Sequence, residues 1–374
     1  MPFQPIPASE QAPLRVGERL CDLTFHNLTN RPVSLYDSRV FGWPKVIHLS
    51  NTPDEAEPGL RELAERFRKF TKMETQVFGV TRAPAEENAR LVKQLELPFP
   101  LLSDPDGRLH EAAGLVSGAA PRTLVFDAAL RLEQVISGGG CDSQAAAALD
   151  YCTTRFDAPK PTVIGEHAPV LVLRNLIDPA HCQRLITLWE HGPKQENMTT
   201  RKSGELRSTP SYKIRRDVRV EPGSPESEEL LGIMARRLVP EIAKAFNFEV
   251  TRYEPFRIGC YDAADRGHFA PHRDNTTKTT KHRRYALTLN LNTGDYEGGY
   301  LRFPEYGRHF YAPPAGGGVV FSCSLLHLAA PVIKGRRFLI AAFFWGEAEQ
   351  PQFEENLGHL FPGGMDITLV RKAS

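Results

Sequence analysis

Long apolar runs are missing from this sequence of 374 residues, and so is an excess of charge of either sign. A transmembrane helix needs ~20 consecutive, mostly apolar residues, and no run in the sequence approaches that length. The segment Met1–Pro7 also lacks the charged stretch and apolar core that mark a secretory signal. We therefore expect a cytoplasmic protein that does not associate with a membrane.

The charges of this chain nearly cancel, with 46 basic and 45 acidic residues. A protein without a strong net charge is not steered to nucleic acid or to an anionic membrane surface. One local basic cluster lies in the run Lys278–Arg284. We interpret this run as a solvated loop, and the alternative is that it recognises an anionic or peptide substrate.

Cysteine is scarce and shows neither a CxxC pair nor the regular spacing of a disulfide framework. Such usage is typical of reduced thiols in a cytosol. The six cysteines are Cys21, Cys141, Cys152, Cys182, Cys260 and Cys323.

The length of 374 residues is too great for one typical domain and sufficient for two. The clearest boundary is Phe156–Thr162, where two prolines within three positions stiffen a segment that neither a helix nor a central strand accepts. We therefore predict one domain at residues 1–158 and a second at residues 159–374.

The N-terminal domain alternates apolar strands with segments of helical periodicity. This order predicts a central sheet with helices on both faces, and the last two strands are close enough to form a hairpin. We expect strands at Lys45–Leu49, Thr75–Val80, Arg122–Phe126 and Leu132–Ile136, and helices at Pro58–Phe70, Pro84–Leu95 and Ser143–Thr153.

The C-terminal domain begins with a strand and two helices that would cover a sheet. Asp178 and Ser224 are each followed by proline, and that pair is typical of a helix N-cap and first helical position. We expect a strand at Pro169–Leu173 and helices at Ala180–Glu190 and Pro225–Phe246. From Arg252 to Trp345 the pattern is one of successive strands between Gly, Pro and Asp turns, which predicts a double-sheet jelly roll.

The most informative motif is His272-Arg273-Asp274, with a second histidine at His327. In an extended strand, residues i and i+2 point the same way, so His272 and Asp274 can reach one ion while Arg273 points away. The long interval that follows lets antiparallel strands bring His327 in from a different strand. Two imidazoles and one carboxylate are the ligands that hold non-haem Fe(II) and leave the opposite positions open. We predict an iron site of the oxygenase type.

A His-x-Asp triplet also arises by chance, so the prediction depends on its context. Arg337, ten residues after His327, precedes Phe338–Trp345, which is apolar enough to be a strand buried on both faces. An arginine at the entrance of such a strand could bind a carboxylate with two parallel hydrogen bonds. The alternative is that Arg337 is an exposed charge at the end of a strand.

These features together resemble the 2-oxoglutarate- and Fe(II)-dependent dioxygenases, in particular the prolyl-4-hydroxylase-like branch. The matching segments cover roughly the C-terminal half in the right order: Cys260–Asp262, Gly267–Asp274, Tyr285–Asn292, Glu297–Phe303 and His327–Arg337. The resemblance implies a double-stranded β-helix, or jelly roll, with flanking helices. It also implies hydroxylation of an amino-acid side chain, with release of succinate and CO2.

The same resemblance implies roles for individual residues. His272, Asp274 and His327 would bind iron, Arg337 would bind the distal carboxylate of 2-oxoglutarate, and Tyr261 would help to hold this cosubstrate. Arg336 is the alternative to Arg337. No side chain beyond the metal centre is expected to act as a catalytic group. The cofactors would be Fe(II), 2-oxoglutarate and O2, with ascorbate as an optional reductant.

Asp274 and the neighbouring residues narrow this interpretation. In related halogenases a small residue takes the carboxylate position, so Asp274 favours hydroxylation over halogenation. Tyr261 has the alternative of a core tyrosine with a satisfied hydroxyl. Gly298-Gly299 is interpreted as a bend between strands. We do not expect His268 or His282 to be metal ligands.

The N-terminal domain resembles the thioredoxin fold of the peroxiredoxin type. The matching segments are Leu101–Gly107, Ala113–Leu115 and Pro121–Asp127. The peroxidatic cysteine should follow the first long strand, yet Ser50–Glu57 contains none, and no cysteine occurs between Cys21 and Cys141. Because peroxide reduction requires a thiolate, we expect a non-catalytic domain that binds a partner, dimerises or has a structural role.

Two other functions remain as alternatives. One is a jelly roll that binds a metal or small ligand without turnover while the thioredoxin-like domain recruits a partner, and the other is a thiol redox enzyme. The partners we expect are a small-molecule, peptide or protein substrate and a second copy of the chain. Proline, lysine or asparagine side chains, free amino acids and small metabolites all suit the family, and the sequence does not choose among them.

Overall fold

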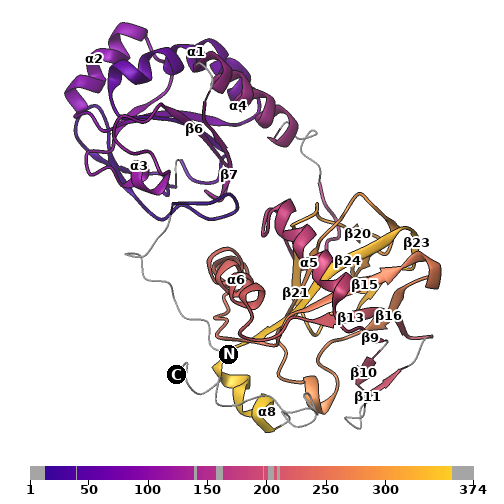
Figure 1. The fold of residues 1–374 in the computed structure, drawn as a ribbon. Coiled ribbons are helices and arrows are strands. Elements are labelled where there is room, and N and C mark those ends of the chain that lie inside the picture. The colour runs from indigo at the N-terminus through magenta and orange to yellow at the C-terminus, as the bar shows by residue number, and fades with distance from the viewer. Residues whose placement is uncertain are drawn as a thin grey trace. The chain divides into compact units, whose positions relative to one another are not determined.

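The computed structural model describes residues 13–355 except 39, 139–140, 157–162, 197, 201–205 and 209–210. The chain forms two compact units that divide between Val163 and Ile164 (Figure 1). Nearly all of the expected linker Phe156–Thr162, including the boundary after position 158, lies outside the described residues. Each unit has its own hydrophobic clusters, so the two are described separately.

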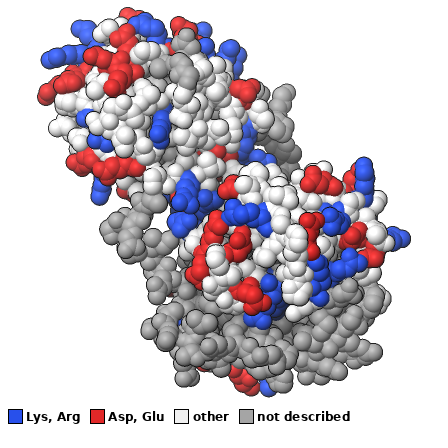
Figure 2. All heavy atoms as spheres, in the orientation of Figure 1, with Lys and Arg blue, Asp and Glu red and all other residues white. Residues whose placement is uncertain are grey.

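The charged side chains at the surface and the lengths of the helices agree with the sequence, which has nearly equal numbers of acidic and basic residues and no long apolar run. Figure 2 shows basic and acidic side chains interspersed over the visible face of the molecule. In the part of the chain that the structure describes, no helix is both long enough and apolar enough to cross a bilayer.

The N-terminal unit contains a seven-stranded sheet in the order β2-β1-β5-β4-β3-β6-β7. The strands β3, β4 and β5 pair in parallel, whereas β6 and β7 form the predicted antiparallel hairpin. The strands are β1 (Thr24–His26), β2 (Pro32–Ser34), β3 (Lys45–Ser50), β4 (Gln76–Thr81), β5 (Leu101–Ser103), β6 (Arg122–Phe126) and β7 (Leu132–Ile136). Parallel strands joined by helices are the arrangement expected of a thioredoxin-like α/β domain.

Helices cover both faces of this sheet, as predicted. The helices are α1 (Pro53–Lys72), α2 (Ala85–Leu95), α3 (Arg108–Ala112) and α4 (Cys141–Phe156). Leu60 of α1 and Ala148 of α4 belong to one buried cluster, whereas Leu109 of α3 belongs to a second cluster that contains alternate residues of β3. The fold class predicted for this half of the chain is therefore confirmed.

The start of α1 was predicted five residues too late, because Pro58 was taken as the first helical position. The helix begins at Pro53, and the hydroxyl of Thr52 accepts a hydrogen bond from the Glu55 backbone N–H at 3.3 Å. Threonine followed by proline is itself a helix-start signal. Pro58 lies inside the second turn, where it removes one backbone donor and its ring crowds the carbonyl four residues earlier, but the helix continues through it.

A buried histidine lies beneath α1. His48 points from β3 toward Gly59, where a Cβ atom would lie only 2.3 Å from the imidazole ring. Its Nδ1 is 3.1 Å from the Thr123 hydroxyl, and in the described residues Nε2 has no hydrogen-bond partner. Burial lowers the pKa of His48 from 6.5 to about 4, so the packing of α1 on the sheet contains a neutral imidazole.

The C-terminal unit consists of two main antiparallel sheets, which confirms the predicted jelly roll. The larger sheet has the order β8-β21-β17-β24-β15-β13-β9, with β14 paired to β24, and the smaller has the order β12-β16-β22-β19-β20. The larger sheet contains β8 (Leu171–Leu173), β9 (Gln195–Glu196), β13 (Arg216–Arg219), β14 (Arg252–Tyr253), β15 (Arg257–Asp262), β17 (Tyr285–Asn290), β21 (Gly318–Ser322) and β24 (Arg336–Trp345). The smaller contains β12 (Lys213–Ile214), β16 (His268–His272), β19 (Leu301–Arg302), β20 (Phe310–Tyr311) and β22 (His327–Ala329). Two further pairs are β10 (Met198–Thr200) with β11 (Leu206–Ser208), and β18 (Glu297–Gly298) with β23 (Val332–Lys334).

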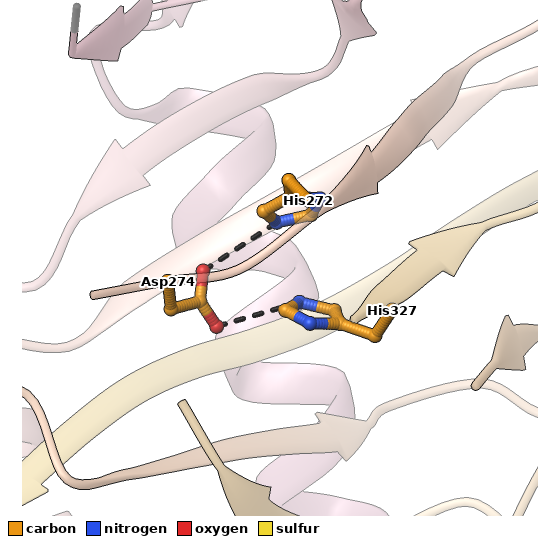
Figure 3. Close-up of side chains that lie close together, drawn as sticks. All are labelled: His272, Asp274 and His327. Carbon is orange, nitrogen blue, oxygen red and sulfur yellow. Dashed lines mark ion pairs between the residues drawn. The ribbon is translucent and has the colours of Figure 1, made fainter. Parts of the chain in front are cut away.

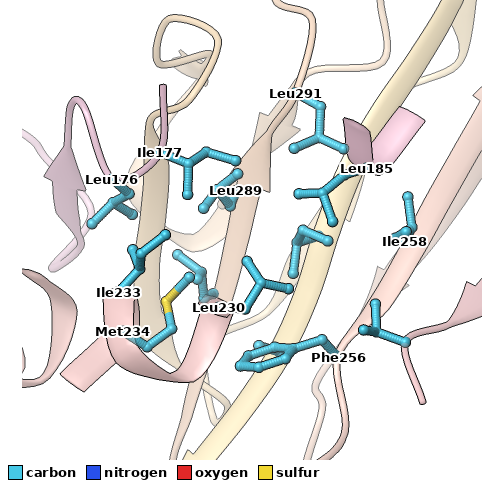
Figure 4. Packing of buried hydrophobic residues seen from close by; sticks show 14 of the residues in the cluster. Leu176, Ile177, Leu185, Leu230, Ile233, Met234, Phe256, Ile258, Leu289 and Leu291 are labelled. Atoms are coloured by element: carbon cyan, nitrogen blue, oxygen red, sulfur yellow. The ribbon is translucent and has the colours of Figure 1, made fainter. Parts of the chain in front are cut away.

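Helices pack on the outer face of the larger sheet, as predicted. They are α5 (Pro179–His191), α6 (Pro225–Ile233) and α7 (Val239–Phe246), and α8 (Gln350–Glu355) follows the last strand. Leu185 of α5 and Leu230 of α6 belong to the same buried cluster as Ile258, Leu289 and Leu291 (Figure 4). Alternate residues of β24, Phe338 to Phe344, join this cluster, so the residues between them face the interior between the sheets.

The segment from Pro225 to Phe246 was predicted as one helix but is interrupted. A π-helical turn at Met234–Leu238 separates α6 from α7. Pro240 cannot donate to the carbonyl four residues before it, and its ring crowds that carbonyl, which accounts for a widened turn ahead of it. The N-cap itself was predicted correctly, since the Ser224 hydroxyl accepts from the Ser227 N–H at 3.2 Å.

We expect the N-terminal unit to lose stability as the pH falls from 6.5 toward 4 because of His48. In that range the unfolded chain binds a proton at His48 and the folded chain does not, so the contribution is present above 6.5 and is lost toward 4. The loss is at most on the order of 3 kcal/mol. Urea unfolding at several pH values should show a smaller pH dependence for His48→Gln than for the parent chain. His191→Gln, at an exposed position, is the matched control, and identical pH profiles for parent and His48→Gln would contradict this assignment.

Candidate metal centre

Two paired strands of the smaller sheet bring the motif residues together. His272 ends β16, Asp274 follows two residues later, and His327 begins β22. His272 and His327 are direct cross-strand partners, and the register between the strands shifts by a bulge between Phe269 and His272. The backbone N–H of Asp274 donates to the Cys323 carbonyl at 2.9 Å, which fixes the carboxylate beside the two imidazoles.

The three side chains point at one another (Figure 3). Nε2 of His272 is 3.4 Å from Oδ1 of Asp274, and Nε2 of His327 is 3.4 Å from Oδ2. One donor atom from each residue lies within 4.8 Å of the others. Bonds of about 2 Å from three donors to one ion place those donors ~3 Å apart, so this spacing fits a shared metal ion.

Backbone carbonyls set the tautomer of both imidazoles. Nδ1 of His272 is 2.8 Å from the Ala270 carbonyl, and Nδ1 of His327 is 3.0 Å from the Leu325 carbonyl. A carbonyl can only accept, so each Nδ1 carries the proton and each Nε2 keeps a lone pair directed at the centre. Histidines that bind metals are oriented by this kind of hydrogen bond.

Protonation states at the centre also favour metal binding. Burial lowers the pKa of His327 to about 4. Burial alone would raise the pKa of the Asp274 carboxyl, but interactions with His327 and His272 outweigh it and hold that pKa well below its usual range. A carboxylate and a neutral imidazole are the forms that coordinate an ion.

Aromatic rings enclose the two histidines. Phe269 stacks on His272 with ring centroids 3.5 Å apart, and Phe321 lies 4.6 Å from His327. Tyr212, in the turn before β12, approaches His272 at 6.2 Å. These contacts restrict water around the imidazoles and hold their rings in place. Sequence reasoning missed Tyr212, since it lies 60 residues before His272 and no local pattern connects the two.

Arg337 lies inside the jelly roll, so its interpretation as an exposed charge is wrong. Its side chain is 2% exposed and donates to the Gly299 carbonyl at 2.6 Å and to Oδ1 of Asn290 at 3.0 Å. Within the described residues, its buried Nε has no hydrogen-bond partner. The neighbouring Arg336 instead faces outward and pairs with Glu190 at 3.2 Å, because successive residues of a strand point to opposite faces.

Tyr261 is the cross-strand partner of Arg337, and the guanidinium carbon lies 5.6 Å from the centre of the tyrosine ring. Tyr261 is buried in a small cluster against which Phe269 packs. Since Phe269 stacks on His272, continuous packing connects the arginine with the two histidines. The Tyr261 hydroxyl accepts from Arg215 at 3.4 Å, a contact that the sequence did not predict.

The glycine pair before β19 forms the predicted bend. Gly298 and Gly299 have φ values of +76° and +67°, and the pairing of β18 with β23 shifts register there. A Cβ at Gly299 would lie 2.8 Å from Val332 and 3.2 Å from Cδ of Arg337. Because glycine has no Cβ, the backbone at position 299 can lie directly against the Arg337 side chain, and the Gly299 carbonyl can accept its hydrogen bond.

The basic run Lys278–Arg284 is only partly the solvated loop that we expected. Lys278 and Arg284 are exposed, but His282 and Arg283 are buried around Glu254, which is fully buried. Arg283 donates to both carboxylate oxygens of Glu254 at 2.5 and 2.8 Å, and Nε2 of His282 is 3.0 Å from Oε1. Charge runs are usually solvated, so the sequence held no sign of this burial.

The ion pair between Glu254 and Arg283 also influences the candidate metal centre through its charge. Burial would raise the pKa of Glu254, but Arg283 and His282 hold it well below its usual range. Arg283 also acts on Asp274 and helps to keep that carboxyl ionised. Neither His268 nor His282 belongs to the group around Asp274.

We expect Glu254→Gln to destabilise the C-terminal unit by about 3–5 kcal/mol, because it leaves the buried Arg283 without a counter-charge. Chemical denaturation of the full chain measures the loss. Glu347→Gln removes an ion pair with Arg252 in which the glutamate is 60% exposed, and it should change stability by less than about 1 kcal/mol. Equal losses of stability for the two substitutions would show that the buried ion pair contributes no more to stability than the exposed one.

Comparison with known proteins finds a similar family for a segment in each half of the chain. Residues 16–135 match the AhpC/TSA family, and residues 256–345 match the 2OG-Fe(II) oxygenase superfamily. A PKHD-type hydroxylase of Paracoccus denitrificans is 28% identical over 144 residues, which are 36% of this chain and 62% of that protein. The chloroplastic peroxiredoxin Q of Sedum lineare is 33% identical over 98 residues, which are 25% of this chain and 50% of that protein.

The chain thus spans less than two thirds of the length of either relative. Among solved structures, a prolyl-4-hydroxylase of Pseudomonas putida aligns with a TM-score of 0.38 and 19% identity, over 48% of this chain and 92% of that one. The two family matches agree with the order of the two folds along the sequence. The chain therefore resembles, in this order, the AhpC/TSA family over residues 16–135 and the 2OG-Fe(II) oxygenase superfamily over residues 256–345.

Proposed function

We propose that the C-terminal unit is an Fe(II)- and 2-oxoglutarate-dependent dioxygenase that hydroxylates an amino-acid side chain. The observation that carries this proposal is the convergence of His272, Asp274 and His327 with both Nε2 atoms and both carboxylate oxygens directed at one centre. A protein that served only as a scaffold would not need two imidazoles whose tautomers are set for a metal ion.

The donor set fits ferrous iron. Two neutral imidazoles and one carboxylate would occupy one face of the ion, and the single negative charge of Asp274 would offset part of the ion's charge. Bound there, Fe(II) would supply the redox chemistry that couples oxidation of 2-oxoglutarate to succinate and CO2 with oxidation of a second substrate by O2. The protein's own contribution is to hold these three ligands and to restrict water around them with Phe269 and Phe321.

Arg337 and Tyr261 are suited to bind the cosubstrate. The guanidinium is buried, and two of its nitrogens are held in place by Gly299 and Asn290. A fixed, planar, charged donor group matches a carboxylate, and burial strengthens this interaction. Tyr261, packed between Arg337 and Phe269, would orient the dicarboxylate between the arginine and the iron ligands.

The substrate is proposed only as a class, an amino-acid side chain in a peptide, a protein or a small molecule. The name PKHD-type hydroxylase describes a relative that this chain matches over only 62% of its length, so it does not specify the substrate of this chain. Asp274 favours hydroxylation over halogenation, because halogenation needs a coordination position free of a carboxylate.

For the N-terminal unit we propose a non-catalytic role in binding a partner, in dimerisation or in structure. The segment Asn51–Glu57 after β3 contains no cysteine, and burial raises the pKa of the Cys152 thiol to about 12. A thiol that stays protonated is a poor nucleophile. Peroxide consumption by the full chain with a thiol reductant would overturn this proposal and favour the thiol redox alternative.

The test of the oxygenase proposal is conversion of 2-oxoglutarate to succinate by the full chain with Fe(II), O2 and ascorbate. A panel of peptides, amino acids and metabolites supplies the second substrate. We expect Asp274→Ala to abolish both turnover and Fe(II) binding, because no other carboxylate of the described residues joins the two histidines. His268→Ala, on the same strand but outside the group, is the matched control and should retain both. Turnover by Asp274→Ala equal to that of the parent would end the proposal.

The role of Arg337 is tested by the pair Arg337→Lys and Arg336→Lys. Lysine keeps the charge but not the planar fork, so Arg337→Lys should raise the KM for 2-oxoglutarate by roughly tenfold to a hundredfold, as expected for the loss of charge-assisted hydrogen bonds of about 1.5–3 kcal/mol. The concentration of Fe(II) for half-maximal activity should stay the same. Arg336→Lys, on the outward face, should change neither value. Equal KM values for both variants and the parent would place the carboxylate site elsewhere.

A further inference from the structure

A second group of metal-binding side chains lies on the outer helices of the C-terminal unit. His181 is in the first turn of α5, and Glu226 and Glu229 lie one turn apart on α6 (Figure 1 labels both helices). One donor atom of each residue lies within 4.8 Å of the other two. The helices are held together beneath this group by Leu185, Leu230 and their neighbours.

His181 is buried without the hydrogen bonds that a buried imidazole needs. It is 1% exposed, and within the described residues its Nε2 has no hydrogen-bond partner. Nε2 lies 3.7 Å from Oε1 of Glu226, and Nδ1 lies 3.5 Å from Oε1 of Glu229. The Nε2 distance is too long for a hydrogen bond, and the Nδ1 distance is at the outer limit for one. An unsatisfied buried polar atom costs about 1–3 kcal/mol, so the arrangement needs a cause.

Donor atoms at these separations fit a metal ion between them. Only one ring nitrogen can bind a given ion, and Nε2, which has no hydrogen-bond partner among the described residues, is the candidate. Bonds of about 2.0–2.2 Å in a tetrahedral site place neighbouring donors ~3.4 Å apart, and Nε2 lies 3.7 Å from Oε1 of Glu226. One donor atom of Glu229 lies within 4.8 Å of the donors of the other two residues, so a small shift of this exposed side chain completes the set. Glu226 and Glu229 are partly exposed, so an ion could enter from solvent.

Arg184 is the competitor for the two carboxylates. Its Nε lies 3.4 Å from Oε1 of Glu226, and its Nη2 lies 2.7 Å from Oε2 of Glu229. Its side chain is 47% exposed, and exposed ion pairs contribute only about 0–1 kcal/mol. The positive ends of both helix dipoles disfavour a cation here by a similar small amount. A divalent ion at this position would gain three ligand bonds, from two carboxylates and one imidazole.

We propose that His181, Glu226 and Glu229 form a second divalent-metal site, of the zinc type, which is separate from the His272–Asp274–His327 centre and links α5 to α6. Three protein ligands leave one position for water. The ion would satisfy the buried imidazole and would displace Arg184 toward solvent. Because the site joins two helices that cover the larger sheet, binding stabilises the C-terminal unit.

The test uses zinc and the full chain with the first centre removed by His272→Ala and His327→Ala. In this background, equilibrium dialysis should show one zinc per chain, and zinc should raise the melting temperature. Adding Glu226→Gln and Glu229→Gln should weaken binding by more than roughly tenfold, since loss of even a supporting partner outside the ligand set has effects of that order. The melting shift should disappear as well.

Two matched variants complete the experiment. Glu228→Gln removes a negative charge from the same helix outside the group and should leave zinc binding unchanged. Arg184→Gln frees both carboxylates and should tighten zinc binding. The same two glutamine substitutions in the chain with an intact first centre should lower the zinc content by one ion per chain. This measurement does not depend on whether the chain without the first centre folds correctly. No saturable zinc binding, or binding that survives loss of both carboxylates, would overturn the proposal.

Discussion

The antiparallel pairing of β16 with β22 is the constraint on which the candidate metal centre depends. It makes His272 and His327 cross-strand neighbours, so one register places two candidate ligands that are far apart in sequence. A slip of one residue in that register would turn one imidazole to the other face of the sheet. The bulge after Phe269 and the Asp274 N–H bond to Cys323 then bring the carboxylate to the same side.

Buried charge is the second constraint, because the interior of this jelly roll contains ion pairs as well as apolar side chains. Glu254 is bound by Arg283 and His282, and Arg337 is bound by Asn290 and Gly299. Such groups are costly to bury unless each is paired. The contacts of Arg337 therefore connect β24 with β17, and those of Arg283 connect the segment before β17 with Glu254. Arg283 also contributes to the electrostatic field in which Asp274 stays ionised. Stability and the protonation state of the site thus depend on the same contacts.

Much of this arrangement is visible in the sequence because its signals are local. The i, i+2 spacing of His272 and Asp274 and the apolar strand after Arg337 are short patterns with a direct physical meaning. The same strand alternation shows which of Arg336 and Arg337 points into the jelly roll once the inner face of β24 is known. Helix starts at Asp178 and Ser224 were equally clear, because a capping side chain acts within three residues.

What the sequence could not predict depends on long-range contacts. Arg283 meets Glu254 across 29 residues, and Tyr212 reaches His272 across 60. In a run of basic residues nothing distinguishes the buried Arg283 from the exposed Arg284. The late start assigned to α1 and the break before α7 came from prolines whose effect depends on the neighbouring turn. Linear patterns do not contain that information.

The two candidate metal sites differ in how their ligands are held, and this difference has a thermodynamic consequence. At the first centre, both imidazoles already donate from Nδ1 to carbonyls, so the unliganded site contains no unsatisfied nitrogen on that side. An ion there would add bonds to a preformed site, so little of the binding free energy would be spent on rearranging the protein and the affinity would be high. At His181 the buried Nε2 has no hydrogen-bond partner among the described residues, and Arg184 would have to move. Binding there relieves a cost that the fold carries, so occupancy acts mainly on the stability of the helices behind the sheet.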